Sequence, residues 1–126
     1  MNTHTKDDEA YEECTSTIAE VLEILGVKRS ILVIGELHGG PRRFNSLRRS
    51  LGNISTQSLT VILRHLEHNG IIDRQVLPTV PVTVEYSLTE QGRQFELVLN
   101  ELHRWGQAWK QQRQTMKKAS LSGEEF

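Results

Sequence analysis

The side chains best suited to specific hydrogen bonding lie on one face of a helix predicted between Ser55 and Gly70. Ser55 is an N-cap candidate, and Asn69-Gly70 supplies a C-cap. At 100° per residue, one side of this helix is an apolar stripe formed by Leu59, Ile62, Leu63 and Leu66. The opposite side is polar and mostly uncharged, and is formed by Gln57, Thr60, Val61, Arg64 and His68. An ordinary solvent face is richer in Glu and Lys, so this composition indicates a surface that binds a partner.

Two of these side chains, Gln57 and Arg64, have the shape that reads bases in duplex DNA. Gln makes bidentate hydrogen bonds with adenine and Arg with guanine, each worth roughly 1–3 kcal/mol of discrimination. Val61 on the same face either contacts a thymine methyl group or is an isolated exposed apolar residue. For the whole face, the alternative is simple exposure to solvent.

The basic residues are concentrated in the same part of the chain. The 126-residue chain has a net charge of −1, but residues 28–75 carry a net charge of +5 and residues 1–13 a net charge of −4. Most of these bases are arginines, whose guanidinium groups fork onto phosphate oxygens. Four of them precede the polar-faced helix, namely Arg42, Arg43, Arg48 and Arg49. They cannot all lie on one side of a helix, so we expect two or three to contact phosphate and the rest to be solvated. The alternative is a wholly solvated basic face.

Three helical segments are predicted before the polar-faced helix. The first carries apolar residues at helical spacing and stops at Gly26. The second covers residues 28–38 and ends at a Gly-Gly-Pro break, and the third covers residues 42–51 and ends at Gly52-Asn53.

Two strands and a long helix are predicted after the polar-faced helix. The apolar period changes to two over residues 71–76 and 82–88, which predicts two strands. Pro78 and Pro81 lack a backbone donor and suit the tip between them. Thr89 is an N-cap candidate for the last helix.

This order of elements predicts a mainly α chain with a small antiparallel β-hairpin, an α+β arrangement. A polar-faced helix directly before a hairpin is the layout of a winged helix-turn-helix. The second helix of the helix-turn-helix pair then enters the major groove, which is about 12 Å wide, and the hairpin wing lies along the backbone or minor groove. The arginines before the helix meet phosphates, which position the helix without reading sequence.

Four sequence segments are specific in combination: Gly39–Arg48, Ile54–Thr60, Leu63–Gly70 and Pro81–Arg93. Together with Cys14 upstream and Trp105-Gly106 downstream, they resemble the HxlR-type family of bacterial winged helix-turn-helix transcription regulators over roughly residues 14–109. The resemblance implies a homodimer, joined through the first and last helices, that binds an inverted repeat near a promoter. It also implies DNA contacts from a recognition helix and from a wing that matches Arg74 to Thr83. The implied contact residues are Ser55, Gln57, Ser58, Thr60 and Arg64 in the helix, and Arg74 and Thr79 in the wing.

The chain departs from the family pattern at two places. Gly26-Val27-Lys28-Arg29 stands where the family commonly has Gly-Gly-Lys-Trp, and Cys14-Thr15 stands where it commonly has Cys-Pro. Both lie outside the DNA-reading helix, so they bear on effector sensing more than on DNA binding.

The last helix carries a heptad-like apolar seam with steps of three and four residues, formed by Phe95, Val98, Leu102, Trp105 and Trp109. With Ile18 and Val21 of the first helix, we expect these residues to form the dimer interface. A two-fold dimer supplies two recognition helices separated by one turn of DNA, about 34 Å. Alternatively, Leu102 and the two tryptophans line a small-molecule pocket.

Cys14 is the only cysteine and has two interpretations. A position at a helix start favours the thiolate, and a reactive thiol near a dimer axis suits a redox or electrophile sensor. The neighbouring Glu12 and Glu13 oppose ionisation, and the alternative is an inert, partly buried cysteine.

Composition narrows the class of protein. One cysteine allows no internal disulfide, which favours a reducing compartment, and no apolar stretch approaches the roughly 20 residues of a membrane span. The N-terminus lacks the pattern of a signal peptide, so we expect a cytoplasmic protein. We expect a flexible acidic arm over residues 1–13, a winged-helix domain with terminal dimerisation helices over 14–112, and a polar tail over 113–126.

No catalytic constellation or phosphate-binding loop is recognisable, so we expect no enzyme and no cofactor. His65 and His68 point about 60° apart, and no cysteine or carboxylate completes a tetrahedral metal site.

The favoured function is a homodimeric, sequence-specific transcription regulator, specifically a repressor, that responds to oxidative or electrophile stress through Cys14. The alternatives are a winged-helix protein-interaction module and a regulator that senses a small molecule without cysteine chemistry.

Overall fold

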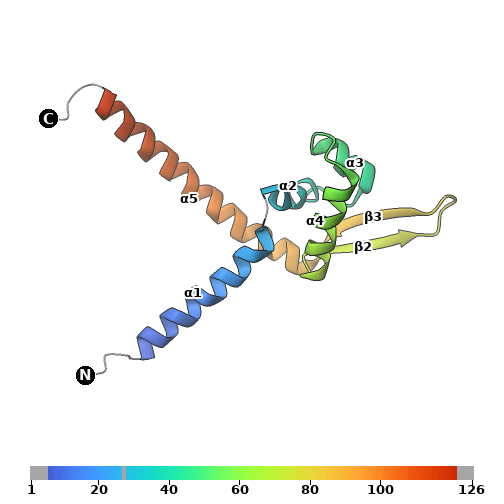
Figure 1. Cartoon of the computed structure of the whole chain (residues 1–126), viewed down its shortest axis with the longest axis horizontal. Coiled ribbons are helices and arrows are strands. Elements are labelled where there is room, and N and C mark those ends of the chain that lie inside the picture. The colour runs from blue at the N-terminus through green and yellow to red at the C-terminus, as the bar shows by residue number, and fades with distance from the viewer. Residues whose placement is uncertain (1–5, 27, 122–126) are drawn as a thin grey trace. The chain divides into compact units, whose positions relative to one another are not determined.

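The structure, a computed structural model, describes residues 6–26 and 28–121. The chain divides between Gly92 and Arg93 into two compact units. The elements in chain order are α1 (Lys6–Leu25), α2 (Lys28–Glu36), β1 (Arg42–Arg43), α3 (Phe44–Ser50), α4 (Thr56–His68), β2 (Ile72–Leu77), β3 (Thr83–Leu88) and α5 (Glu90–Leu121). All of them except β1 are labelled in Figure 1.

The core of the first unit is built from α2, α3, α4 and the start of β2. Its fully buried apolar side chains include Val33, Ile34, Leu37, Leu47, Leu59, Leu63, Leu66 and Ile72. The apolar stripe predicted for α4 is the buried face of that helix, so the prediction is confirmed. Burying this stripe leaves the polar face of α4 directed outwards.

The two ends of α4 are fixed by local hydrogen bonds, as the sequence predicts. At the N-terminus, Ser58 N donates to Ser55 Oγ over 3.1 Å. At the C-terminus, Gly70 N donates to Glu67 O and Ile71 N to Leu66 O, each over 3.0 Å. Gly70 has φ +75°, the left-handed conformation that this C-terminal motif requires. The chain therefore passes directly from α4 into the sheet.

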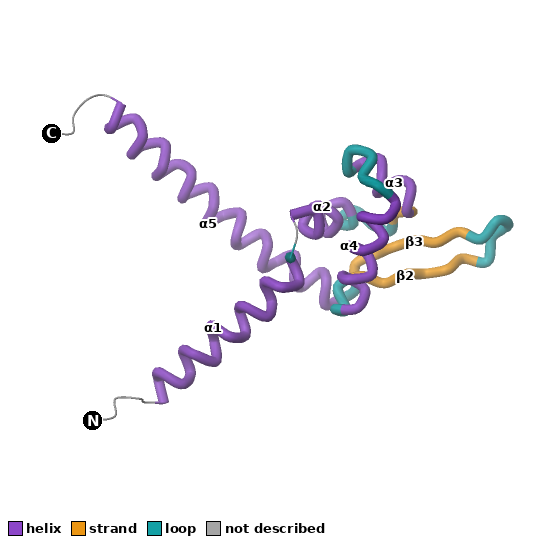
Figure 2. Tube along the Cα trace, in the orientation of Figure 1, coloured by secondary structure: helices purple, strands orange, loops and turns teal. Residues whose placement is uncertain are grey.

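The sheet has three antiparallel strands in the order β1-β3-β2. The predicted hairpin is confirmed: β2 pairs with β3 from Ile72↔Leu88 to Leu77↔Thr83, and Figure 2 shows it projecting from the helices of this unit. The third strand was not predicted, since residues 42–51 were expected to be helical. Arg42 and Arg43 pair with Tyr86 and Glu85 before α3 begins, and two residues are too few to show a strand period.

The terminal helices are longer than the sequence predicts. Helix α1 begins at Lys6, so residues 6–13, expected to be a flexible arm, are helical. Acidic residues in the first turn of α1 favour this start because they complement the helix dipole. Helix α5 begins after the predicted cap, where Gly92 N donates to Thr89 Oγ1 over 2.9 Å, and continues to Leu121 through most of the expected tail. Residues 1–5 and 122–126 lie outside the described residues.

Candidate nucleic-acid interface

The outward face of α4 presents Gln57, Ser58, Val61, Arg64 and His68 to solvent. The exposed fraction of Val61 is 63%, which is high for an apolar residue on a helix whose other face is the core. Thr60 is half-buried, and its hydroxyl donates to Thr56 O over 2.7 Å. The face therefore offers amide, guanidinium, hydroxyl and methyl groups together, the types that read base edges.

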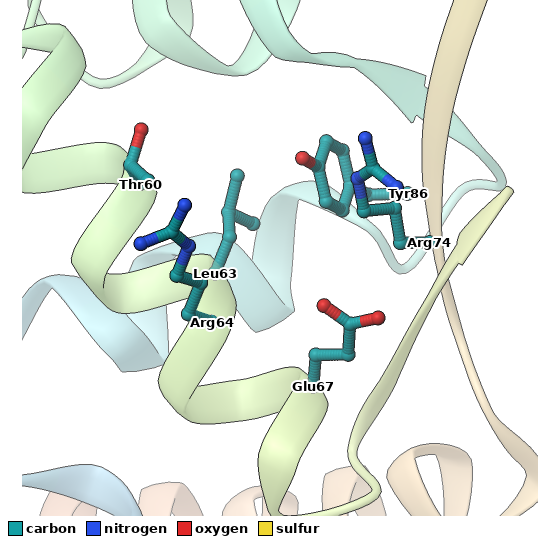
Figure 3. A pocket seen from close by; sticks show the side chains of 6 residues that line it. All are labelled: Thr60, Leu63, Arg64, Glu67, Arg74 and Tyr86. Carbon is teal, nitrogen blue, oxygen red and sulfur yellow. The ribbon is translucent and has the colours of Figure 1, made fainter. Parts of the chain in front are cut away.

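A hollow of about 440 Å³ lies between α4 and the sheet, and Figure 3 shows its lining side chains. Thr60, Arg64 and Glu67 enter it from α4, while Arg74 and Tyr86 enter it from β2 and β3. Arg74 and Tyr86 are direct cross-strand partners, so their side chains share one face of the sheet. Two guanidinium groups from different elements thus flank one hollow.

Glu67 is a member of this hollow that was not among the predicted site residues. It follows Thr60 by seven residues and Arg64 by three, so helical spacing alone places it beside them. A carboxylate is a chemical group that can accept a hydrogen bond from the N4 amino group of cytosine, and its charge repels phosphate.

A second hollow, of about 430 Å³, lies between α3 and the wing. Arg43 and Arg49 line it from one side, and Pro81, Val82 and Thr83 line it from the other. Both arginines are exposed. Their charges lie beside the wing, where a backbone phosphate can be bound.

Arg42 and Arg48 are arranged differently from Arg43 and Arg49. Arg42 Nη1 lies 2.8 Å from Glu36 Oε2, Nε donates to Ser46 Oγ over 2.8 Å, and Nη2 donates to Ser50 Oγ over 2.7 Å. Arg48 is half-buried, and its Nε has no hydrogen-bond partner within the described part of the chain. Arg42 therefore links α2 to α3 and is not available to a phosphate in this arrangement.

The wing tip is ordered by its own hydrogen bonds. Thr79 N donates to Leu77 O over 2.8 Å, and Thr79 Oγ1 donates to Pro81 O over 2.7 Å. The hydroxyl groups of Thr79 and Thr83 lie 2.6 Å apart. Thr79 is exposed, but its hydroxyl already has partners within the tip.

Cys14 is a free, exposed thiol on α1. Because α1 begins at Lys6, Cys14 lies eight residues, about 12 Å, inside the helix. The dipole effect is confined to the first turn, so the expected activation of Cys14 by a helix start does not apply. Exposure, the other requirement for a sensor, is met.

Helix α5 carries an exposed apolar face in the second unit. Val98, Leu102, Trp105 and Trp109 are all exposed, whereas Phe95, expected in the same seam, is buried in the chain itself. The rings of Trp105 and Trp109 are stacked with centroids 6.1 Å apart, and the Arg113 guanidinium lies 4.7 Å above the Trp109 ring. Exposed, preorganised aromatic side chains are typical of protein interfaces.

Helix α1 carries its own exposed apolar residues, Ile18 and Leu22, in the first unit. Val21 is half-buried.

Among residues 6–26 and 28–121, no group of three or more His, Cys, Asp or Glu side chains is placed to hold a metal ion, and no helix there is long and apolar enough to cross a membrane.

A wing beside a helix with an outward polar face is the arrangement of a winged helix-turn-helix protein. The family model that matches residues 24–114 is the HxlR-like helix-turn-helix, so the chain belongs to the HxlR family, as its sequence motifs indicate.

Known relatives agree with this assignment. An HTH-type transcriptional regulator of Synechocystis sp. is 46% identical over 95 residues, covering 75% of this chain and 70% of the relative. The redox regulator HypR in its oxidised form is 39% identical with a TM-score of 0.64, covering 73% of this chain and 95% of HypR. The reduced form of the regulator YodB from Bacillus subtilis is 33% identical with a TM-score of 0.63, covering 82% and 91%.

Proposed function

We propose that the chain is a homodimeric repressor that binds an inverted-repeat operator in duplex DNA. The observation that carries this proposal is the outward face of α4, where Gln57 and Arg64 are exposed and the exposed Arg74 lines the same hollow as Arg64. The exposed Arg43 and Arg49 add positive charge between α3 and the wing. A repressor of this kind acts by occupying promoter DNA.

The roles of the contacting residues divide by chemistry. Gln57 and Arg64 read base edges, and Val61 packs against a thymine methyl group. Arg43 and Arg49 bind phosphate beside the wing, and Arg74 binds it beside α4. Arg42 supports the fold, because its guanidinium is engaged by Glu36, Ser46 and Ser50.

The dimer is proposed to form through α1 and α5. Each helix exposes apolar side chains that a soluble monomer would bury, among them Ile18 on α1, and Leu102 and Trp105 on α5. Two-fold symmetry then presents two copies of α4 to successive major grooves.

We further propose that oxidation of Cys14 releases the repressor. The thiol is exposed on α1, a proposed dimerisation helix, and the similar protein HypR is a redox regulator. With one cysteine per chain, a disulfide requires two molecules: two thiols lose two electrons and two protons to an oxidant such as a quinone or peroxide.

Salt dependence of DNA binding tests the central part of this proposal. If three arginines per protomer contact phosphate, a dimer neutralises about six, and the affinity for duplex should fall about a thousandfold between 50 and 200 mM salt. An affinity that is flat across this range would contradict DNA binding. It would favour the alternative, a winged-helix module that binds a protein.

A further inference from the structure

His65 of α4 contacts the end of α1, which lies more than forty residues earlier in the chain. The Nε2 atom lies 3.2 Å from Glu23 O and 3.1 Å from Ile24 O. Both partners are carbonyl oxygens, which only accept, so Nε2 carries the proton and donates to both. We call this pair of contacts the His65 tie.

The tie satisfies groups that α1 cannot satisfy by itself. Glu23 and Ile24 lie in the last turn of α1, where carbonyl oxygens have no partner within the helix. That turn contains no basic residue, and among residues 6–26 and 28–121 the other donor to these two carbonyls is Gly26 N, 3.2 Å from Glu23 O. A donor near a helix C-terminus is favourable, and here α4 supplies it.

The surroundings of the tie are not closely packed. A hollow of about 270 Å³ lies beside it, lined by Glu23, Gly26, Ser30, Val61, Ile62 and His65. Ser30 Oγ in this wall is buried with no hydrogen-bond partner in the described part of the chain. Because this hollow leaves part of the junction unfilled, we expect the hydrogen bonds of His65 to contribute to the orientation of α4 relative to the end of α1, beside the packing of both helices on α2.

We propose that His65 is a positioning residue, which sets the separation of the two recognition helices in the dimer by holding α4 to α1. This inference rests on the proposed function, because it requires dimerisation through α1 and base reading by α4. His65 follows Arg64 directly and Val61 by one turn, so a change at the tie moves the DNA-reading face without touching DNA.

The test compares duplexes that carry the same two half-sites at separations changed one base pair at a time. Two added base pairs rotate one half-site by about 70° relative to the other. The wild-type dimer should bind its preferred spacing at least about tenfold more tightly than spacings two base pairs away. His65→Leu, which has no donor, should reduce this preference to about threefold or less, while affinity for a single half-site stays within about twofold of wild type.

Two further variants separate positioning from general damage. His65→Gln retains an amide donor and should recover most of the spacing preference. His38→Leu changes an exposed histidine outside α4 and should leave the preference intact. Circular dichroism and thermal melting check that each variant is folded, and if His65→Leu is not folded, His65→Asn, whose amide is too short for both carbonyls, takes its place.

The outcomes distinguish failure of the proposed function from failure of the positioning role of His65. If the wild-type protein shows no sequence-specific binding, the proposed function fails. If the wild type is specific and the folded His65→Leu or His65→Asn variant keeps the wild-type spacing profile, the positioning role of His65 is overturned.

Discussion

The guanidinium of Arg42 lies 2.8 Å from the carboxylate of Glu36, whereas the next residue, Arg43, is exposed beside the wing. Two adjacent arginines therefore have different roles. Arg42→Ala should lower the free energy of unfolding by about 1–2 kcal/mol, because it removes charge-assisted hydrogen bonds to Glu36, Ser46 and Ser50. Urea denaturation measures this change.

Arg43→Ala is the matched control for that experiment. It should leave the free energy of unfolding within about 0.5 kcal/mol of wild type, as expected for an exposed residue, and should weaken DNA binding. If the two variants lost the same unfolding free energy, the assignment of Arg42 to the fold and of Arg43 to DNA binding would be wrong.

Arg64 is predicted to determine sequence preference. Arg64→Ala should weaken binding to the preferred operator by about 1–3 kcal/mol. The same variant should lose much less affinity for random duplex. Arg43→Ala should weaken binding to operator and to random duplex by a similar factor. The slope of log affinity against log salt should also become shallower, by the amount expected for about one phosphate contact per protomer. Equal losses on operator and random DNA for Arg64→Ala would argue against base reading. Fluorescence anisotropy titrations on both duplexes provide the comparison.

Gly92 is predicted to be required for the close approach of its backbone to Ile71. A Cβ at this position would lie well inside van der Waals distance of the Ile71 carbonyl oxygen, which also accepts from Thr89 N. Gly92→Ala should therefore cost at least about 2 kcal/mol of unfolding free energy. Gly35→Ala, where a Cβ meets nothing within 4 Å, should be neutral or stabilising by no more than about 1 kcal/mol. Thermal melting measures the stability of both variants. If Gly92→Ala left the unfolding free energy unchanged, this packing would be contradicted.

The apolar face of α5 is predicted to hold the dimer together. Leu102→Glu places a charge in the seam with Trp105 and Trp109, so sedimentation should show a shift towards monomer and a loss of operator binding. Leu97→Glu changes a leucine that is also exposed but lies about 100° away from the seam, and this variant should remain dimeric. If Leu102→Glu dimerised at the same protein concentration as the wild type, this seam would be excluded as the interface.

Cys14 is predicted to make DNA binding sensitive to oxidants. Treatment with a quinone or hydrogen peroxide should release the wild-type protein from its operator, and Cys14→Ser should stay bound. Gel-shift assays with and without a reducing agent measure both. Release of Cys14→Ser by the same treatment would remove the thiol from the mechanism.

The parts of the fold that the sequence predicts are those with local causes. Ser55 and Gly70 act through hydrogen bonds within a few residues, so the bounds of α4 were predictable to within one residue. The burial of Leu59 and Leu63 follows from periodicity over the same helix.

The remaining features depend on residues that are distant in the chain. Strand β1 exists because Arg42 and Arg43 meet β3, and nothing in two residues indicates that pairing. The His65 tie joins positions separated by more than forty residues. By contrast, Glu67 lies at helical spacing from Arg64, so its place in the hollow could have been predicted from the sequence pattern.

Selection of bound duplexes from a random pool is the sharpest test of sequence reading by a dimer. We expect enrichment of an inverted repeat whose half-sites are centred about 10 base pairs, or a multiple of that, apart, because two copies of α4 must enter major grooves on one side of the DNA. Recovery of a pool with no shared sequence, from a protein that is folded and dimeric, would contradict it.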